Sequence, residues 1–244
     1  MFIALVISAL VGLFAARSIV AESDAHRFEL TDRWYNPTCD TCTSTLNALL
    51  TSCTKHRHRQ RRTNIFVLAA TVVLSAALAS VAPTLWVLPA YLVFLWTMIL
   101  LTVTDLDTQL IPNRILGPAT AVGSVLLLIG HLFDTSAGSL TSALLGAVAY
   151  FLVMYLLASV VRGGLGFGDV KLAFLIGLFT GYYSLGHVLV AGIGSFFIGG
   201  AVSLILLIGR KRTRKDAIPF GPFMTIAALL ALFIGQDVLD WYLR

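Results

Sequence analysis

The chain has 244 residues, of which 58% are hydrophobic and only 12% are charged, and its mean hydropathy is +0.89. This composition excludes an ordinary soluble domain and is typical of a polytopic membrane protein. The net charge of +5 does not indicate nucleic-acid binding, because topology and anionic lipid headgroups already account for basic clusters beside membrane helices.

Eight apolar runs predict membrane helices, since a spanning helix needs about 20 apolar residues. They cover residues 2–20, 65–82, 84–103, 114–132, 140–161, 169–183, 186–208 and 219–236. The sixth run is short, and Gly181-Tyr-Tyr-Ser-Leu-Gly186 predicts a turn between it and the seventh. The expected fold is therefore all-α, a polytopic membrane bundle of about eight transmembrane helices. It comprises a first helix (1–20), a Cys-rich cytoplasmic loop (21–64) and a membrane-embedded core (65–244).

Lys and Arg gather in the loops that face the cytoplasm if the N-terminus lies outside. The first such loop holds Arg27, Arg33, Lys55, Arg57, Arg59, Arg61 and Arg62, and the last holds Arg210, Lys211, Arg212, Arg214 and Lys215. The loops around Pro83, Asp134 and Tyr183 hold none. The positive-inside rule therefore predicts an outside N-terminus. No basic residue precedes the first run, so we expect a retained helix and not a cleaved signal peptide.

All three cysteines fall in the first loop. They form Cys39-Asp-Thr-Cys42 and, after ten intervening residues, Cys53-Thr-Lys-His56. This spacing predicts a structural, tetrahedral Cys3His zinc site like a zinc knuckle, with His58 as an alternative to His56. A bound metal would hold together a loop that has few apolar side chains to bury.

Two other interpretations of the cysteines stay open. The three thiols could be free and reduced, or Cys39 and Cys42 could form a redox pair. A thioredoxin-type pair would accompany a βαβ pattern, which the sequence lacks. A disulfide is disfavoured in a reducing compartment.

Two aspartates lie at the edges of apolar runs, where an ionisable group indicates function by default. Asp105 ends the third run, and Asp169 follows a glycine-rich stretch and is placed as the N-cap of the sixth. Asp107 is two residues beyond Asp105 and points to roughly the opposite side of a helix, so the two are not expected to share a task. Taken singly, these carboxylates also fit a helix cap, a solvated surface, or an ion relay in a transporter.

The order of three motifs resembles the type IV prepilin peptidases, membrane aspartyl proteases of the Gly-x-Gly-Asp class. The motifs are Asp105-Leu-Asp-Thr-Gln-Leu-Ile-Pro-Asn113, Gly166-Phe-Gly-Asp-Val-Lys-Leu172 and Ile218-Pro-Phe-Gly-Pro-Phe223. The entry to the cysteine loop, Asn36-x-x-Cys39-x-x-Cys42, is similar too, so the resemblance covers nearly the whole chain.

The resemblance implies that Asp105 and Asp169 form the catalytic dyad. The motif residues around them are Gly166, Gly168, Pro219, Gly221 and Pro222. Two neighbouring carboxylates share a proton, so that one acts as general base on water and the other as general acid toward the peptide carbonyl. No covalent intermediate is then needed.

The resemblance also implies a substrate, a location and a second activity. The substrate is a prepilin or pseudopilin with a short basic leader, cleaved at the cytoplasmic face of the bacterial inner membrane. Anionic lipids are further expected partners, and the oligomeric state is left undetermined. Family members can also N-methylate the new N-terminus with S-adenosylmethionine, an activity linked to the first loop. Here that loop is short and its second cysteine pair is reduced to Cys53 and His56, which leaves methylation open. A cation-coupled transporter and a structural partner in a secretion apparatus are the alternative functions.

Overall fold

The computed structural model describes residues 60–160, 165–209 and 218–244, and this part of the chain is helical throughout, without β-strands. Its helices are α2 (Gln60–Val81), α3 (Leu88–Thr108), α4 (Asn113–Phe133), the short 3₁₀ helix η1 (Thr135–Ala137), α5 (Leu140–Val160), α6 (Phe167–Tyr183), α7 (Leu185–Ile208) and α8 (Gly221–Tyr242). All seven predicted helices that fall in these ranges are present. The predicted first helix and most of the cysteine loop lie outside them.

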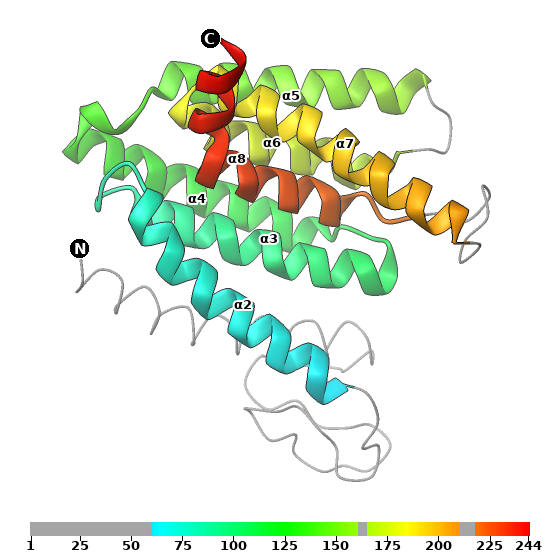
Figure 1. The fold of residues 1–244 in the computed structure, drawn as a ribbon. Coiled ribbons are helices and arrows are strands. Elements are labelled where there is room, and N and C mark those ends of the chain that lie inside the picture. Colours follow the sequence, from blue (N-terminus) through cyan, green and yellow to red (C-terminus); the bar gives the residue numbers. More distant parts are fainter. Residues whose placement is uncertain (1–59, 161–164, 210–217) are drawn as a thin grey trace.

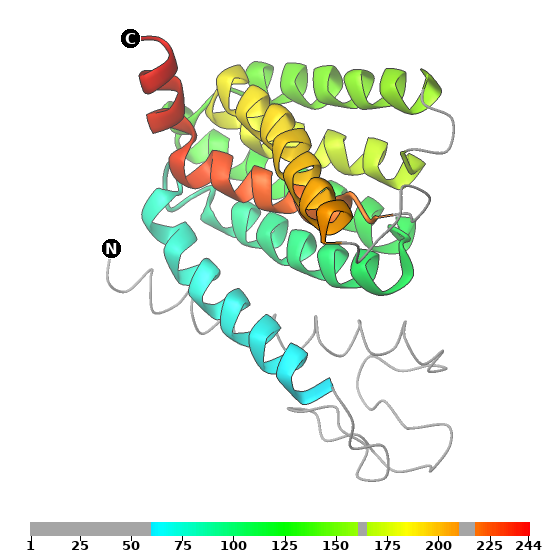
Figure 2. The same ribbon diagram turned by 45° about the vertical axis from the view of Figure 1, so that its right-hand side comes forward.

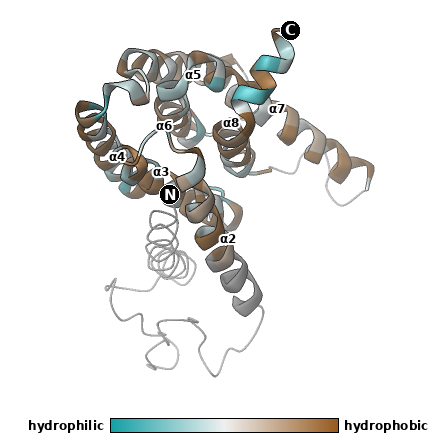
Figure 3. Ribbon diagram, turned by 60° about the vertical axis from the view of Figure 1, so that its left-hand side comes forward, coloured by the Kyte–Doolittle hydropathy of each residue, from teal (hydrophilic) through white to brown (hydrophobic). Residues whose placement is uncertain are grey.

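Five helices of the described part are long and apolar enough to cross a membrane. These spans are Leu88–Leu106, Asn113–Phe133, Leu140–Val160, Leu185–Ile208 and Gly221–Tyr242. Helix α2 contributes a shorter apolar stretch, Ala69–Val81, and α6 has only 17 residues. Figure 3 shows hydrophobic colour along most of the bundle and hydrophilic colour mainly near helix ends. The fold is thus an all-α bundle with membrane character.

Several helix ends differ from the predicted ones because polar residues continue the helices beyond the apolar runs. Helix α2 begins at Gln60, five residues before the predicted start at 65. The added first turn contains Gln and Arg, which are good helix formers. Helix α8 continues to Tyr242 instead of 236, and the Gln236 amide donates to the Asp240 carboxylate at 2.9 Å in this extension. Helix α3 runs to Thr108 instead of 103, so Asp105 lies inside its last turn.

The predicted turn between the sixth and seventh helices is confirmed at Ser184. Its backbone N–H donates to Thr180 O at 3.4 Å and ends α6, while its hydroxyl accepts the backbone N–H of His187 at 3.3 Å and begins α7. One residue therefore caps both helices.

Helix α6 is the inner helix of the bundle, and twelve of its seventeen residues are buried. It packs against α4, α5, α7 and α8. Figure 1 shows α2 along one edge of the bundle and α5 along the opposite edge, with the other helices between them, and Figure 2 shows the same order after rotation.

Glycines bring α5 and α6 into backbone contact. A Cβ added to Gly177 of α6 would lie 2.8 Å from the Ala147 Cα and would also collide with the Gly146 carbonyl oxygen of α5. A Cβ at Gly181 would lie 2.8 Å from the Ser142 carbonyl oxygen, one turn further along. Small residues of this kind let membrane helices pack closely by van der Waals contact. The position of α6, and of every residue on it, therefore depends on these glycines.

Gly177→Ala is expected to destabilise the folded bundle by roughly 1–3 kcal/mol, the usual cost of overpacking a core. Only backbone opposes the added methyl group, so α5 and α6 must move apart. Unfolding of the purified protein in mixed micelles measures the effect. Gly200→Ala on α7 is the matched control, because a Cβ there meets nothing within 4 Å. Equal stability of the two variants would contradict the close α5–α6 packing.

Candidate active site

Asp105 lies in the last turn of α3 with its side chain 4% exposed. The helix ends there because Gln109 adopts the left-handed conformation, with φ 55° and ψ 30°, and its N–H donates to Asp105 O at 2.9 Å. Pro112 then precedes α4 in extended conformation. The chain turns sharply within this segment and leaves the Asp105 carboxylate inside the bundle.

The Asp105 carboxylate accepts a hydrogen bond from the start of α8. The backbone N–H of Gly221 donates to Asp105 Oδ2 at 3.0 Å, although the two residues are 116 positions apart. A Cβ at position 221 would lie 2.6 Å from the same oxygen, so only glycine brings this amide so close. Pro222 follows within the first turn of α8, where the missing N–H of a proline costs nothing. The motif around Gly221 thus contacts the first aspartate directly.

Asp169 lies in the first turn of α6 and is 8% exposed. The structure corrects the prediction that it is the N-cap. The N-cap is Gly166, which is extended at φ −75° and ψ 144°, and Asp169 is the third helical residue. Its Oδ2 accepts the Gly166 N–H at 3.2 Å, which is the return half of a capping box. The carboxylate is therefore held back over the helix start.

The start of α6 contacts the connection that follows Asp105. A Cβ at Gly168 would lie 2.8 Å from the Ile111 Cβ. Ile111 can therefore pack this close only because Gly168 has no side chain. Deeper in the bundle, the Tyr91 hydroxyl of α3 donates to Phe179 O of α6 at 2.8 Å, and the Phe94 and Phe179 rings stack at 4.6 Å. These contacts join α3 and α6 around Phe179.

The structure thus brings the two predicted aspartates to the same end of the bundle. The start of α8 contacts the end of α3 there through the Gly221–Asp105 hydrogen bond, and the start of α6 contacts Ile111, which follows α3. Asp169 lies at a helix N-terminus, where the macrodipole favours an anion, and Asp105 lies near a helix C-terminus, where it does not. Neighbouring carboxylates of this kind can share one proton and perform general acid–base chemistry.

Of the five predicted motif residues, Gly166 and Gly221 donate backbone hydrogen bonds to the aspartates. Gly168 packs against Ile111, and Pro222 lies in the first turn of α8. Pro219 is half-buried just before that helix.

Sequence analysis did not single out two contacts at this end of the bundle. Ile111 fills the space beside Gly168, and Lys171 Nζ donates to Asn113 Oδ1 at 2.9 Å. The only sequence signal was the position of Ile111 and Asn113 on either side of Pro112, which marked a turn but not its partner. Contacts between α4 and α6 are not encoded in the spacing of either segment.

The predicted zinc ligands Cys39, Cys42, Cys53 and His56, and the alternative His58, lie outside the described residues. The same holds for the side chain of Asp107. Among the residues that are described, no group of three or more His, Cys, Asp or Glu side chains could hold a metal ion. The zinc site therefore stays a prediction.

Comparison with known proteins identifies relatives over much of the chain. Residues 92–208 match a family model described as the type IV leader peptidase family. A protein of Aeromonas hydrophila named prepilin leader peptidase/N-methyltransferase is 34% identical over 180 residues, which cover 71% of this chain and 59% of that protein. Proteins of the same name are 32% identical in Bacillus subtilis, over 62% of this chain and 58% of the relative, and in Pseudomonas aeruginosa, over 65% and 54%. The matches thus span less than two thirds of the relatives' length. No solved structure matches the chain.

Proposed function

Because residues 92–208 place this chain in the type IV leader peptidase family, we propose that it is a membrane aspartyl endopeptidase that removes the leader of prepilin or pseudopilin precursors. The observation that carries the proposal is the presence of two buried carboxylates at the same end of the bundle. Each accepts a backbone N–H from a glycine of a predicted motif, Asp105 from Gly221 and Asp169 from Gly166. Capping alone accounts for the bond from Gly166 to Asp169, but it does not account for a second buried carboxylate at the same end of the bundle.

The first chemical step is the addition of water to the scissile peptide bond. The ionised member of the dyad takes a proton from water, whose oxygen attacks the carbonyl carbon, and the protonated member donates its proton to the carbonyl oxygen. In the second step a carboxyl proton passes to the leaving nitrogen as the C–N bond breaks, and the other carboxylate takes a proton from a hydroxyl of the gem-diol, which becomes the new carboxyl group. The products are a carboxylic acid on the leader and a free amine on the mature protein, and the dyad again holds one proton.

In this mechanism Gly221 and Gly166 orient the dyad. Their N–H groups occupy one oxygen of each carboxylate and leave the other oxygen for water or substrate. A hydrogen bond to a carboxylate is worth about 1.5–3 kcal/mol, so each donor fixes the side chain on which it acts. The two aspartates are catalytic residues, and the glycines are positioning residues.

The expected location follows from the basic loops. The protein spans the bacterial inner membrane several times, with its N-terminus outside and the dyad facing the cytoplasm. The substrate presents a short basic leader ahead of an apolar helix. The dyad lies at the ends of α3 and α6, where such a leader would meet the bilayer surface.

Co-expression with a prepilin tests the function. An immunoblot should show the shortened product only when this protein is present, because leader removal changes the size of the precursor. An ion-coupled transporter or a structural partner of a secretion apparatus would leave the precursor uncleaved. An intact precursor beside correctly inserted protein would therefore reject the peptidase.

N-methylation of the mature N-terminus is a second candidate activity, because the relatives are named prepilin leader peptidase/N-methyltransferase. A mass spectrum of the cleaved product tests it. An added methyl group that depends on S-adenosylmethionine supports this activity, and an unmodified amine restricts the enzyme to cleavage.

We also propose that Cys39, Cys42, Cys53 and His56 bind one structural zinc ion, with His58 as the alternative fourth ligand. Cys42→Ser is expected to lower the zinc content of the purified protein from about one ion per chain toward zero, since tetrahedral sites need all four ligands. Elemental analysis measures this, with Ser44→Ala as a control substitution close by in the same loop. An equal content near zero in wild type and Cys42→Ser would rule the site out.

A further inference from the structure

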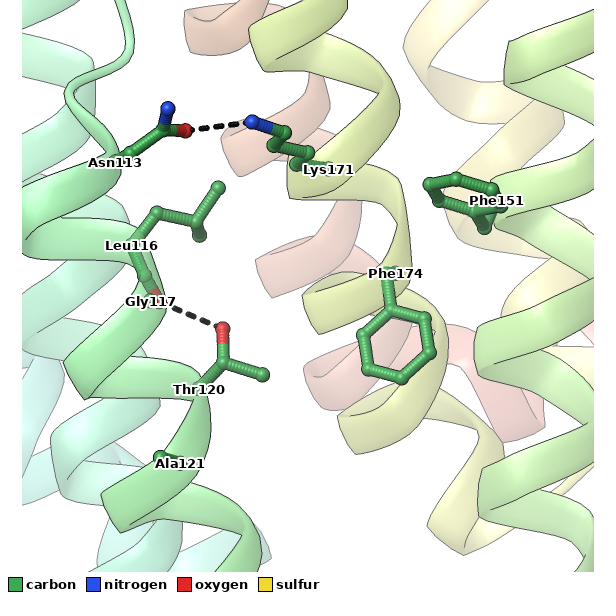
Figure 4. A pocket seen from close by; sticks show the side chains of 8 residues that line it. All are labelled: Asn113, Leu116, Gly117, Thr120, Ala121, Phe151, Lys171 and Phe174. Carbon is green, nitrogen blue, oxygen red and sulfur yellow. Dashed lines mark hydrogen bonds between the residues drawn. The ribbon is translucent and has the colours of Figure 1, made fainter.

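A cleft of about 510 Å³ opens between α4 and α6, beside the end of the bundle that carries the dyad. Figure 4 shows its walls: Leu116 and Gly117 come from α4, Phe151 from α5 and Phe174 from α6. Lys171 and Asn113 stand together at one end of it. Its volume is within the range of ~300–1,000 Å³ that is common for small-molecule sites.

The walls of the cleft are apolar. The Thr120 hydroxyl, which also lines it, donates to Leu116 O of its own helix at 2.7 Å, so it turns a methyl group toward the space. Gly117 leaves room, because a Cβ there would meet nothing within 4 Å. Both α4 and α5 are long and apolar enough to span a membrane, which would put these walls beside lipid acyl chains.

The polar end of the cleft is built around the Lys171 ammonium group. Its Nζ donates to Asn113 Oδ1 at 2.9 Å and lies 4.9 Å from the centre of the Phe167 ring. An ammonium group has three N–H donors. Within residues 60–160, 165–209 and 218–244, Asn113 accepts one of them. The cation is thus held at the cleft while it keeps donors for an anionic ligand.

The cleft is separate from the catalytic dyad. Lys171 and Asp169 are two residues apart on α6, which at about 100° per residue puts them on roughly opposite sides of the helix. Asp169 is buried and accepts the Gly166 N–H, whereas Lys171 reaches Asn113 of α4.

We propose that this cleft binds one anionic phospholipid, with its phosphate on Lys171 and Asn113 and one acyl chain along Leu116, Phe151 and Phe174. Basic pockets between membrane helices bind lipid headgroups of this kind. Charge decides between occupants, because the prepilin leader is basic and would place a cation beside Lys171. A lipid phosphate instead supplies an anion for the donors that Asn113 leaves open within the described part of the chain.

Native mass spectrometry of the full-length protein, released from detergent after addition of phosphatidylglycerol or phosphatidylcholine with identical chains, tests the proposal. The wild type should retain one phosphatidylglycerol in preference to phosphatidylcholine. Lys171→Gln should reduce that preference about fivefold, the change that corresponds to ~1 kcal/mol for one basic residue at an anionic surface. The measurement does not involve cleavage, so its result is independent of the proposed peptidase activity.

The acyl part of the site is tested by filling it. Gly117→Leu should reduce retention of both lipids severalfold. Gly200→Leu, at another glycine where a Cβ meets nothing within 4 Å, should retain them as the wild type does. Gly117→Ala supplies a smaller filling if the leucine variant does not fold. Equal retention by the position 117 and position 200 variants would overturn the proposal, as would an unchanged preference in Lys171→Gln. Displacement of phosphatidylglycerol by an apolar prepilin peptide would reassign the cleft to the substrate and reject the lipid.

Discussion

Asp105→Asn and Asp169→Asn are each expected to reduce leader removal by about 10²–10⁴-fold, the usual contribution of general acid–base catalysis. The amide keeps the volume of the carboxyl group, and its oxygen can still accept the N–H that each aspartate receives, from Gly221 and Gly166 respectively. The change therefore removes proton transfer and leaves the hydrogen bond. An immunoblot of a co-expressed prepilin measures the loss.

The control is Asp237→Asn, which replaces an exposed aspartate near the far end of α8. It should cleave as the wild type does. Full processing by either dyad variant, with normal membrane insertion, would show that the aspartates have a structural task only. The double variant should be about as active as each single variant, because the rate losses of residues that act as one unit are not additive.

Gly221→Ala is expected to reduce kcat by about 10- to 100-fold, with little change in KM. The added Cβ would lie 2.6 Å from Asp105 Oδ2, so the carboxylate must move and its hydrogen bond from the Gly221 N–H is strained or lost. The magnitude corresponds to ~1.5–3 kcal/mol for a hydrogen bond to a charged group. Cleavage of a detergent-solubilised prepilin over a range of substrate concentrations measures both constants.

Gly200→Ala is the matched control for this variant, since it adds the same methyl group to an open position on α7. Comparison of unfolding temperatures separates a misplaced carboxylate from a misfolded bundle. If Gly221→Ala is as active as Gly200→Ala, the Gly221 N–H does not position Asp105.

Hydropathy predicted the helices well, because a membrane helix must satisfy its backbone internally and bury an apolar surface, and both requirements are local. The helices α5 and α7 begin and end within one residue of the predicted limits. The errors occurred where local signals compete. Helix α3 continues to Thr108, past the predicted limit of 103, and Asp169 is the third residue of α6 and not its cap.

The candidate site was predicted in part for the same reason. Carboxylates beside apolar runs are visible in the sequence, and the order of helices brings both to one end of the bundle. Gly221 was recognised in the sequence as part of a motif. Its hydrogen bond to Asp105 could not be predicted, because the two residues are 116 positions apart.

By itself, the sequence determined an all-helical membrane protein with two acidic residues at helix ends, since both properties depend on residues that are neighbours in the chain. Tertiary structure alone decided that the Gly221 amide reaches Asp105, that Ile111 occupies the space left by Gly168, and that α4 and α6 leave a cleft beside Lys171. The physical reason is the close packing of helix ends. Contacts there depend on which backbones approach where a Cβ is missing, and no spacing within one helix contains that information.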